Sequence, residues 1–243
     1  YATGTVTGTN NYVGGLIGYN YKSTVTNSYA TGAATGTDQV GGLVGRHVND
    51  SSITNSYATG AVTGSSYVGG LVGVLAGTIT KSYATGAVTG SADLGGLVGY
   101  KESGTVTSSF YDRETTGRSD TGKGTPKTTA EMKTLATFSG AGWDIDGAGG
   151  TGKVWRMYEG DAYPLLRSFL TAATATVKND LIKVYDGSTT VASGSHTWDI
   201  AVDEGKVFGT AVYTSASKNA GNRVVALTGL YSNQQGYDIK TQD

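Results

Sequence analysis

Few residues of this chain are of the types that carry out catalysis or bind metal ions. Histidine occurs only as His47 and His196, and cysteine does not occur, which excludes disulfides and thiolate chemistry. Neither histidine begins a His-Glu-x-x-His sequence, the pattern of many zinc peptidases. We therefore interpret both histidines as ordinary surface or loop residues. The sequence predicts no catalytic residue and no metal site.

Two carboxylate pairs, Asp144/Asp146 and Asp203/Glu204, and one glycine-rich loop are the other candidates for chemistry. Asp144 and Asp146 are close enough in sequence to bind Ca²⁺, although such pairs in glycine-rich loops are more often turn residues. Residues 147–153 nearly match a phosphate-binding loop, but Val154 stands where that loop needs a hydroxyl side chain. The sequence thus predicts no cofactor, with Ca²⁺ as an unsupported alternative.

The dominant pattern of the chain is a five-residue sequence, Gly-Gly-Leu-(Ile/Val)-Gly, that occurs four times. Its copies start 27, 28 and 26 residues apart, and Tyr-Ala-Thr-Gly recurs in step with them. The copies begin at Gly14, Gly41, Gly69 and Gly95, and those of the second sequence at Tyr1, Tyr29, Tyr57 and Tyr83. A period of about 20–50 residues is typical of repeat architectures.

Short runs of β-type residues separate these glycines. The runs are too short for helices and lack helical apolar spacing, so the sequence predicts an all-β protein. Stacked copies would form a β-solenoid over residues 1–110, with three short strands per coil and about four to five coils. We expect the glycines to turn corners at positive φ. In Leu71-Val72, strict alternation allows only one side chain to face the core.

Two outward columns are the candidate binding residues. Thr-x-Thr runs place an apolar residue inside and hydroxyl groups outside, in successive coils at Thr26, Thr54 and Thr80. Counting by twos from an inward Val62 places Tyr57 outward, which would make Tyr29, Tyr57 and Tyr83 an exposed aromatic column able to stack on sugars. A bend at Gly60, between Tyr57 and Val62, would instead place the tyrosines in the core. Both alternatives remain open.

The remaining sequence is built differently, because residues 1–110 contain only 8 of the 37 charged residues. Residues 128–131, Thr-Thr-Ala-Glu, match a capping box and precede apolar residues up to Phe138, which predicts a short helix. We interpret residues 111–170 as the C-terminal cap of the solenoid. Residues 171–243 are predicted to form a small β domain.

The repeats resemble the GLUG motif of large bacterial surface proteins. The segment after them resembles the usual end of such arrays, with Phe110-Tyr111-Asp112, Gly142-Trp143-Asp144 and Tyr163-Pro164-Leu165-Leu166. Farther on, Lys183-Val184-Tyr185-Asp186-Gly187, the run from Lys218 to Leu230 and Gly236-Tyr237-Asp238-Ile239 resemble the YDG-type module of haemagglutinin-like adhesins. The second resemblance implies that residues 171–243 adopt a β-grasp-like fold.

These resemblances imply a non-enzymatic fragment of a large adhesin on the bacterial cell surface, outside the cell, that mediates cell-surface or biofilm-matrix adhesion. Its partners would be a host or matrix glycan or protein receptor, or like molecules on neighbouring cells. A net charge of −1 gives no reason to expect nucleic acid, and no apolar run reaches the length of a membrane span. Because the chain begins within a repeat, we expect it to be a piece of a longer protein.

Two other functions fit parts of the same pattern. A β-helix enzyme acting on polysaccharides would need clustered acidic residues in a cleft, and the low charge of residues 1–110 argues against one. An ice-binding solenoid would use the threonine column to order water. Ser52 interrupts that column, and the ordinary role of outward hydroxyl groups is to keep a β face soluble.

Overall fold

The computed structural model describes residues 1–178, 186–191, 194–217 and 224–242, which form two compact units. The first unit runs from Tyr1 to Trp143 and the second from Asp144 to Asp243. The boundary therefore lies inside the segment that the sequence suggested as the cap.

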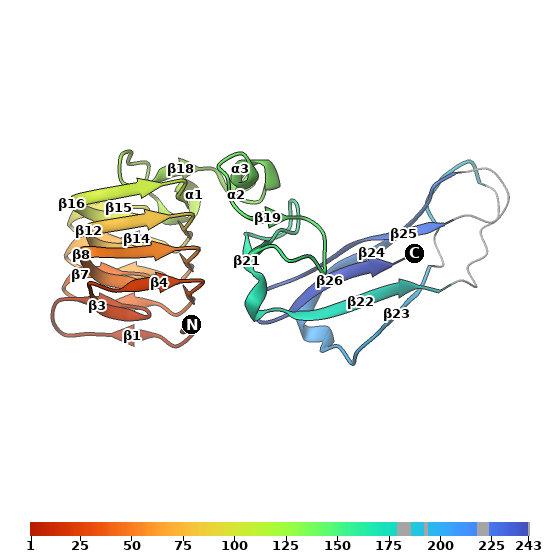
Figure 1. Ribbon diagram of the computed structural model, residues 1–243, viewed down its shortest axis with the longest axis horizontal. Coiled ribbons are helices and arrows are strands. Elements are labelled where there is room, and N and C mark those ends of the chain that lie inside the picture. The colour runs from red at the N-terminus through yellow and green to blue at the C-terminus, as the bar shows by residue number, and fades with distance from the viewer. Residues whose placement is uncertain (179–185, 192–193, 218–223, 243) are drawn as a thin grey trace. The chain divides into compact units, whose positions relative to one another are not determined.

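The first unit confirms the predicted β-solenoid, in which four coils stack through parallel strands (Figure 1). Each full coil contributes to four sheets, where the sequence predicted three strands. The first sheet contains β1 (Val6–Thr7), β6 (Ala34–Thr35), β10 (Val62–Thr63) and β14 (Val88–Thr89). The second contains β2 (Val13–Gly14), β7 (Asp38–Gly41), β11 (Ser66–Gly69) and β15 (Ala92–Gly95).

The other two sheets complete each coil. The third contains β3 (Ile17–Tyr21), β4 (Thr24–Thr26), β8 (Val44–Thr54), β12 (Val72–Thr80) and β16 (Val98–Thr107). The fourth contains β5 (Tyr29–Ala30), β9 (Tyr57–Ala58), β13 (Tyr83–Ala84), β17 (Phe110–Asp112) and β18 (Thr125–Lys127). The strand count differs from the prediction because the strands begin and end at other places. The Leu-Val-Gly and Thr-x-Thr runs form one long strand, as in β12, whereas the Tyr-Ala run and the Val-Thr run that follows it form two separate strands, as in β9 and β10.

Equivalent residues of successive coils pair in register, so the apolar side chains form columns. Val62, for example, pairs with Ala34 on one side and with Val88 on the other. Two separate cores result. The first and second sheets enclose a valine-rich core, and the third and fourth enclose a larger core of leucine, isoleucine, valine and alanine. Because each coil covers the apolar residues of the next, no coil would be stable alone.

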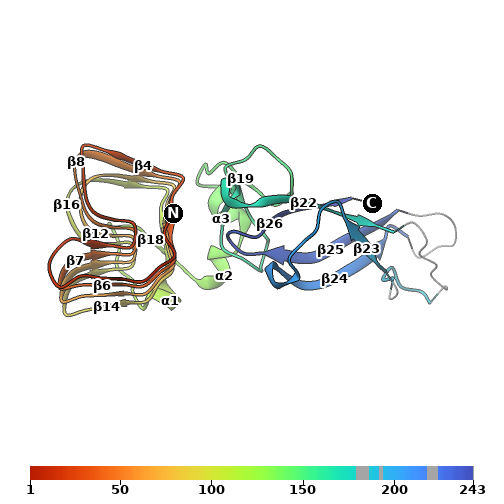
Figure 2. The same ribbon diagram turned by 90° about the horizontal axis from the view of Figure 1, so that it is seen from below.

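The Gly-Gly-Leu-Val-Gly sequence is an arch that brings the second and third sheets back to back. In Figure 2, which looks along the stack, β12 of the third sheet lies beside β7 of the second sheet. A Cβ on Gly73 would lie 2.5 Å from the carbonyl oxygen of Gly45 and 2.8 Å from the amide nitrogen of Val40. The two sheets therefore meet without intervening side chains, and any larger residue at Gly73 would force them apart.

Both apolar residues of the arch are buried, because they lie at its tip rather than in one continuous strand. Leu71 and Val72 are fully buried in the larger core, and both of their amides donate to the carbonyl of Leu97 in the next coil. The expected role of glycine at the corners is wrong for the arch, since no arch glycine has positive φ. The residues with positive φ that flank the arches and follow the Thr-x-Thr runs are Tyr12, Gln39, Tyr67, Asp93, Asn27, Asn55, Lys81 and Ser108.

A buried serine ladder joins the coils between the third and fourth sheets. The hydroxyl of Ser82 accepts a hydrogen bond from the amide of Ser56 at 3.2 Å and donates to the carbonyl of Thr80 at 2.9 Å. Ser28 and Ser109 continue the same pattern at either end. This ladder explains why serine precedes the aromatic residue in successive coils.

The last coil is closed by short elements that follow β17. They include α1 (Arg113–Thr116), α2 (Thr129–Met132) and α3 (Leu135–Ser139). The predicted capping box is present, because the side chain of Thr128 accepts from the amide of Glu131 and the Glu131 side chain accepts from the amide of Thr128. Tyr111 fills the core position that Ala84 occupies one coil earlier, and its hydroxyl donates to the carbonyl of Asp120 at 2.5 Å.

The second unit consists of small sheets. They contain β19 (Ile145–Asp146), β20 (Trp155–Arg156) and β21 (Leu165–Leu166); then β22 (Thr171–Val177), β23 (His196–Trp198) and β26 (Tyr237–Gln242); and the pair β24 (Val207–Ser215) and β25 (Val225–Ser232). Two 3₁₀ turns, Arg167–Phe169 and Glu204–Lys206, lie between them. Much of the expected YDG-type pattern, at residues 183–185 and 218–223, lies outside the described residues.

Candidate functional site

The predicted aromatic column is a buried ladder and not an exposed surface. Tyr29, Tyr57 and Tyr83 are 0%, 1% and 1% exposed. Adjacent rings stack with centroids 5.1 and 4.8 Å apart and planes 5° from parallel. Successive residues of a strand point to opposite faces, and the neighbouring alanines belong to the larger core. The tyrosines therefore point away from that core, as counting by twos predicted, yet the exposed column inferred from this direction is wrong.

Aromatic residues of the closing segment extend the ladder at its C-terminal end. The ring of Trp143 lies 6.4 Å from that of Tyr83 and 4.8 Å from that of Phe138 in α3. The indole nitrogen of Trp143 donates to the carbonyl of Ser108 at 2.8 Å. Burial, with the stacked rings on either side, raises the pKa of Tyr57 well above its usual value. These contacts give the tyrosine ladder a role in stability.

The predicted threonine column is present on the outer face of the third sheet. Thr26, Thr54 and Thr80 pair in register through β4, β8 and β12. Thr26 is exposed, whereas Thr54 and Thr80 are half-buried. A second column runs beside the first, with the hydroxyl of Ser52 donating to that of Thr24 at 3.1 Å. The sheet thus presents two parallel columns of hydroxyl groups to solvent.

A second outward surface, not identified from the sequence, lies where each arch opens. One of its columns directly precedes the Val-Gly-Gly sequence and the other directly follows Leu-Val-Gly. We call it the arch-mouth surface; it consists of Tyr12, Tyr19, Gln39, Arg46, Tyr67 and Tyr100. The ring of Tyr12 lies 5.4 Å from that of Tyr19, and the ring of Tyr67 lies 5.4 Å from that of Tyr100. Tyr12, Tyr19 and Tyr100 are 42%, 48% and 43% exposed.

Arg46 belongs to the coil between the two aromatic pairs of the arch-mouth surface. Its guanidinium donates to the side-chain oxygen of Gln39 at 2.9 Å and pairs with the carboxylate of Glu102 at 3.0 Å. Arg46 belongs to the second coil and Glu102 to the fourth, so the side chain passes over the third coil at Val74, which is buried. These contacts fix the guanidinium plane and neutralise its charge.

The arch-mouth surface was missed because its residues differ from coil to coil. Tyr19 is replaced by Arg46, Val74 and Tyr100 in the following coils, so no identical column is visible in the sequence. The signal in the sequence that could have revealed this surface is the position of its residues relative to the arch glycines. Residues next to the arch glycines must leave the tightly packed region, and large side chains there can only point to solvent.

His47 is not the surface residue that the sequence suggested. It is fully buried, and its Nδ1 lies 2.9 Å from the amide nitrogen of Asn20 in the preceding coil. Its Nε2 has no hydrogen-bond partner among the described residues. Burial lowers the pKa of His47 because the charged imidazolium would be poorly solvated there. The same position in the third coil is Leu75, so His47 is a core residue.

The carboxylates considered for Ca²⁺ are each paired with a different cation. Asp144 lies 2.8 Å from the ammonium group of Lys153 and accepts from the amide of Val154 at 3.1 Å. Asp146 lies 2.8 Å from the guanidinium of Arg167. Within the described ranges, no three acidic, histidine or cysteine side chains lie together as a metal site would require. Lys153 of the phosphate-loop-like segment is thus engaged with a carboxylate.

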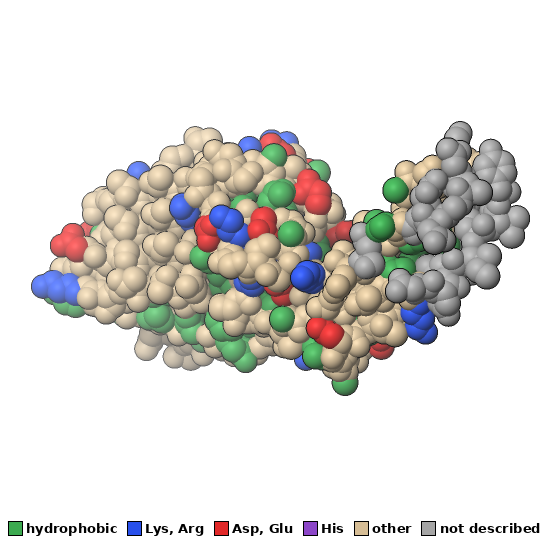
Figure 3. Space-filling model, turned by 45° about the vertical axis from the view of Figure 1, so that its right-hand side comes forward, with side chains coloured by type: hydrophobic (Ala, Val, Ile, Leu, Met, Phe, Trp, Pro, Cys, Tyr) green, Lys and Arg blue, Asp and Glu red, His purple; other side chains and the backbone are tan. Residues whose placement is uncertain are grey.

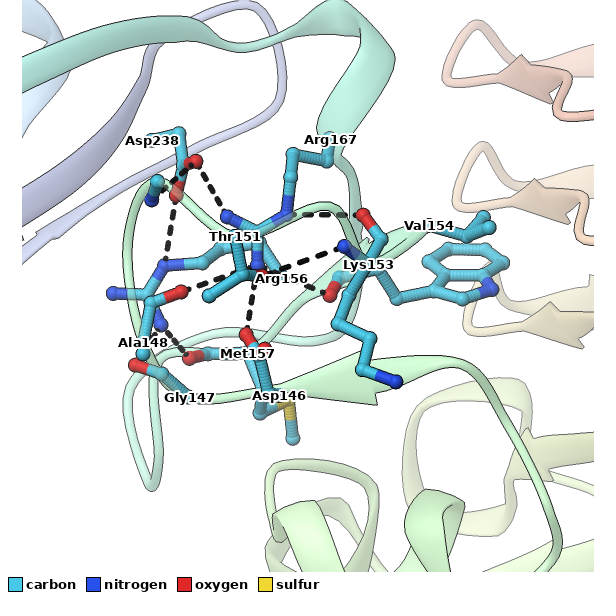
Figure 4. A network of polar contacts seen from close by, with 12 residues as sticks. Asp146, Gly147, Ala148, Thr151, Lys153, Val154, Arg156, Met157, Arg167 and Asp238 are labelled. Carbon is cyan, nitrogen blue, oxygen red and sulfur yellow. Dashed lines mark hydrogen bonds and ion pairs between the residues drawn. The ribbon is translucent and has the colours of Figure 1, made fainter.

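Arg167 and Asp238 centre a buried network in the second unit (Figure 4). Asp238 pairs with Arg167 and with Arg156, the latter at 3.3 Å, and accepts from the amide of Gly150 at 2.9 Å. Arg156 also donates to the carbonyl of Gly147. The network joins the glycine-rich loop to β26 and leaves both arginines engaged with acceptors. It stabilises the second unit.

Charged side chains are sparse over most of the solenoid (Figure 3). Residues 1–110 carry equal numbers of acidic and basic groups, four of each. The solenoid surface therefore presents hydroxyl groups, amides and tyrosine rings more than charges. In the part of the chain that the structure describes, no helix is long and apolar enough to cross a membrane.

Comparison with known proteins identifies the repeat. The model of the GLUG motif matches residues 9–35, 36–63 and 64–89, and the fourth Gly-Gly-Leu-Val-Gly copy lies outside these matches. A stretch of 62 residues, 26% of the chain, is 56% identical to a Gly-rich membrane protein of Evansella cellulosilytica, and the match spans 6% of that protein. No solved structure matches the chain. The first unit is thus a β-solenoid that carries three GLUG motifs in its coils.

Proposed function

We propose that this chain is a non-enzymatic binding segment of a larger bacterial surface protein, located outside the cell, that mediates adhesion. Its partners are glycans or proteins of a host or of the extracellular matrix, or like molecules on neighbouring cells. The observation that carries the proposal is the in-register stack, which repeats outward side chains in columns along the third sheet. The GLUG repeats and the short match to a far longer relative support it.

The physical basis of the proposed adhesion is multivalency. Strands of successive coils lie about 4.8 Å apart, so each outward position is offered several times along one line. Weak contacts at such positions act together when they engage one extended partner, because each new contact forms at a high effective concentration. A repetitive partner such as a polysaccharide or another repeat protein matches this arrangement.

The absence of an enzymatic role is part of the proposal. Residues 1–110 hold few charges, and Arg46 and Glu102, which could otherwise act in catalysis, neutralise one another. The carboxylates of Asp144 and Asp146 are paired with Lys153 and Arg167. Turnover of a polysaccharide by the isolated chain, measured as release of reducing ends, would contradict this part.

Adhesion can be tested with beads that carry the chain. Beads coated with residues 1–243 should bind to bacterial cells or biofilm matrix more than beads coated with the second unit alone, residues 144–243. Deletion of residues 1–110 from the parent protein should lower attachment of the producing cells. If coated beads bind nothing and the deletion leaves attachment unchanged, the adhesion proposal is wrong.

Ice binding is a second candidate, which the double column of hydroxyl groups favours. Thr24 and Thr26 of the first coil lie in register with Ser52 and Thr54 of the second. Such an array can order water on a flat sheet. Half-burial of Thr54 argues against it. Thermal hysteresis in a freezing assay would support ice binding, and its absence in concentrated protein would exclude it.

A further inference from the structure

We infer that the arch-mouth surface is a binding site for an uncharged saccharide chain. This inference rests on the proposed function, for which it names the site and the chemical class of the ligand. The site contains aromatic rings held in pairs, and between them lie a fixed guanidinium and an amide. The following paragraphs take these features in turn.

The exposed rings are held in place before any ligand binds. Tyr12 and Tyr19 meet edge to face, as do aromatic pairs in protein cores, and Tyr19 also stacks with Tyr21 at 6.4 Å. Tyr67 and Tyr100 form the corresponding pair toward the fourth coil. Ordered rings bind with little loss of side-chain entropy. Their faces can cover the apolar C–H faces of sugar rings while their hydroxyl groups stay in water.

Polar groups between the ring pairs provide hydrogen bonds of fixed direction. The Arg46 guanidinium has five N–H donors in one plane, and its contacts to Gln39 and Glu102 hold this plane in position. Glu102 keeps 49% of its side chain exposed and can accept from sugar hydroxyls. Donors and acceptors beside aromatic faces match the alternating hydroxyl and C–H groups of a saccharide.

The charge balance of the site selects an uncharged ligand. The single cation, Arg46, is already paired with Glu102, so an acidic sugar would have to compete with this carboxylate. Asp93 lies at the position in the fourth coil that Tyr67 occupies in the third, which adds an acidic group near the same end. An anionic chain would find no unpaired cation among the six residues of the arch-mouth surface. Binding of a neutral chain should change little with salt, because no charge is neutralised.

The spacing along the stack favours a chain over a single sugar. Tyr19 belongs to the first coil and Tyr100 to the fourth, in equivalent positions of the third sheet. Three coil spacings of about 4.8 Å separate them by roughly 14 Å. One monosaccharide cannot reach both rings, whereas an oligosaccharide along the stack can.

The test is binding of soluble neutral polysaccharides by the whole chain. Affinity electrophoresis with a neutral glucan, mannan and xylan, and with polygalacturonate as the acidic counterpart, would be run on wild type and on Tyr19→Ala/Tyr100→Ala. Tyr1→Ala is the matched control, since Tyr1 is 58% exposed and lies outside the arch-mouth surface. We expect retardation by at least one neutral polysaccharide, about tenfold weaker in the double variant and unchanged in the control.

Several outcomes would overturn the inference. These are no retardation by any neutral polysaccharide, equal retardation of the double variant, or retardation by polygalacturonate alone that disappears at high salt. Circular dichroism checks that the double variant folds, and Tyr19→Leu/Tyr100→Leu replaces it if it does not. If coated beads adhere to cells equally well with the double variant, the site is wrong while adhesion stands. If polysaccharides bind to the wild type but coated beads never adhere to cells, the saccharide site stands and the adhesion proposal is wrong.

A protein ligand at the same surface is the remaining outcome. Bead adhesion that depends on Tyr19 and Tyr100, but is abolished by protease treatment of the target cells and not by glycosidases, would replace the saccharide with a protein partner. That result would refute the inferred ligand class.

Discussion

The rings of Tyr57 and Tyr83 lie parallel with their centroids 4.8 Å apart, which is also the usual spacing of neighbouring strands. One tyrosine from each coil therefore covers the face of the next, and the ladder adds ring contacts to the backbone hydrogen bonds between coils. Mutations at these positions should lower the stability of the first unit if the tyrosines form a buried ladder. They should lower sugar binding and leave stability unchanged if the tyrosines form an exposed column.

Tyr57→Ala should strongly destabilise the first unit. Tyr57 is 1% exposed between two stacked rings, and removal of a large buried aromatic side chain typically costs about 3–5 kcal/mol. Urea unfolding followed by circular dichroism measures the change, with Tyr57→Phe expected to cost much less because the ring remains. Equal stability of wild type and Tyr57→Ala would show that the ladder does not hold the coils together.

Gly73→Ala should also destabilise the first unit, through the backbone instead of a side chain. The added Cβ would lie 2.5 Å from the carbonyl oxygen of Gly45 and 2.6 Å from the carbonyl carbon of Gln39. Relief requires the two back-to-back sheets to separate, for which we expect a loss of more than about 3 kcal/mol. Gly4→Ala is the control, because a Cβ there meets nothing within 4 Å. Similar melting temperatures for the two variants would contradict the arch packing.

His47 should make the solenoid sensitive to acid. Its pKa is lowered in the folded state, so below the usual value of about 6.5 the unfolded chain binds a proton that the folded chain does not. The stability that His47 contributes as a neutral residue is present above that pH and is lost as the pH falls toward the folded-state pKa. Urea unfolding at a series of pH values between neutral and mildly acidic conditions measures this loss.

The substitution that isolates the acid effect is His47→Leu, which copies Leu75 of the next coil. It should flatten the pH dependence of the first unit's stability. His196→Gln is the control, since the pKa of His196 is also lowered by burial but the residue lies in the second unit. A pH dependence that survives His47→Leu and disappears in His196→Gln would assign the effect to the other histidine.

Asp238→Asn should destabilise the second unit. Asp238 and its partner Arg156 are each 6% exposed, and removal of one partner from a buried ion pair typically costs about 3–5 kcal/mol. Hydrogen exchange should show lost protection in β20 and β26, with the solenoid unaffected. Lys153→Gln, which removes a surface pair, should leave the exchange pattern unchanged. Equal protection in both variants would mean that the network is not needed for the fold.

The regular features of the fold could be predicted from the sequence, because they depend on repeated short-range patterns. The repeat period predicted the stacked coils, and the alternation around Ile53 and Ile79 predicted which side chains face inward and which face outward. The spacing of Thr128 and Glu131 predicted the helix cap. The number of strands per coil was harder to predict from the sequence. Whether Leu71 and Val72 lie in one strand or at the tip of an arch depends on contacts with residues of other sheets.

The candidate site was harder to predict, since it depends on what covers a side chain as well as on where that side chain points. The alternation placed Tyr57 outward correctly, but only the structure shows that its ring is buried. Arg46 and Tyr19 lie in one column because β3 and β8 pair in register, although the two side chains differ in their chemistry. His47 was assigned to the surface from its type, and the adjoining coils bury it.

The direction of the backbone hydrogen bonds gives the solenoid a mechanical property. Bonds such as that from the amide of Leu43 to the carbonyl of Leu71 connect one coil to the next along the stack. A pull along this axis loads the coils in series, so they detach one at a time. Each released coil of about 27 residues can lengthen the chain from about 4.8 Å to roughly 90 Å. A tether of this kind would yield in steps under flow, limiting the peak force on whatever it holds.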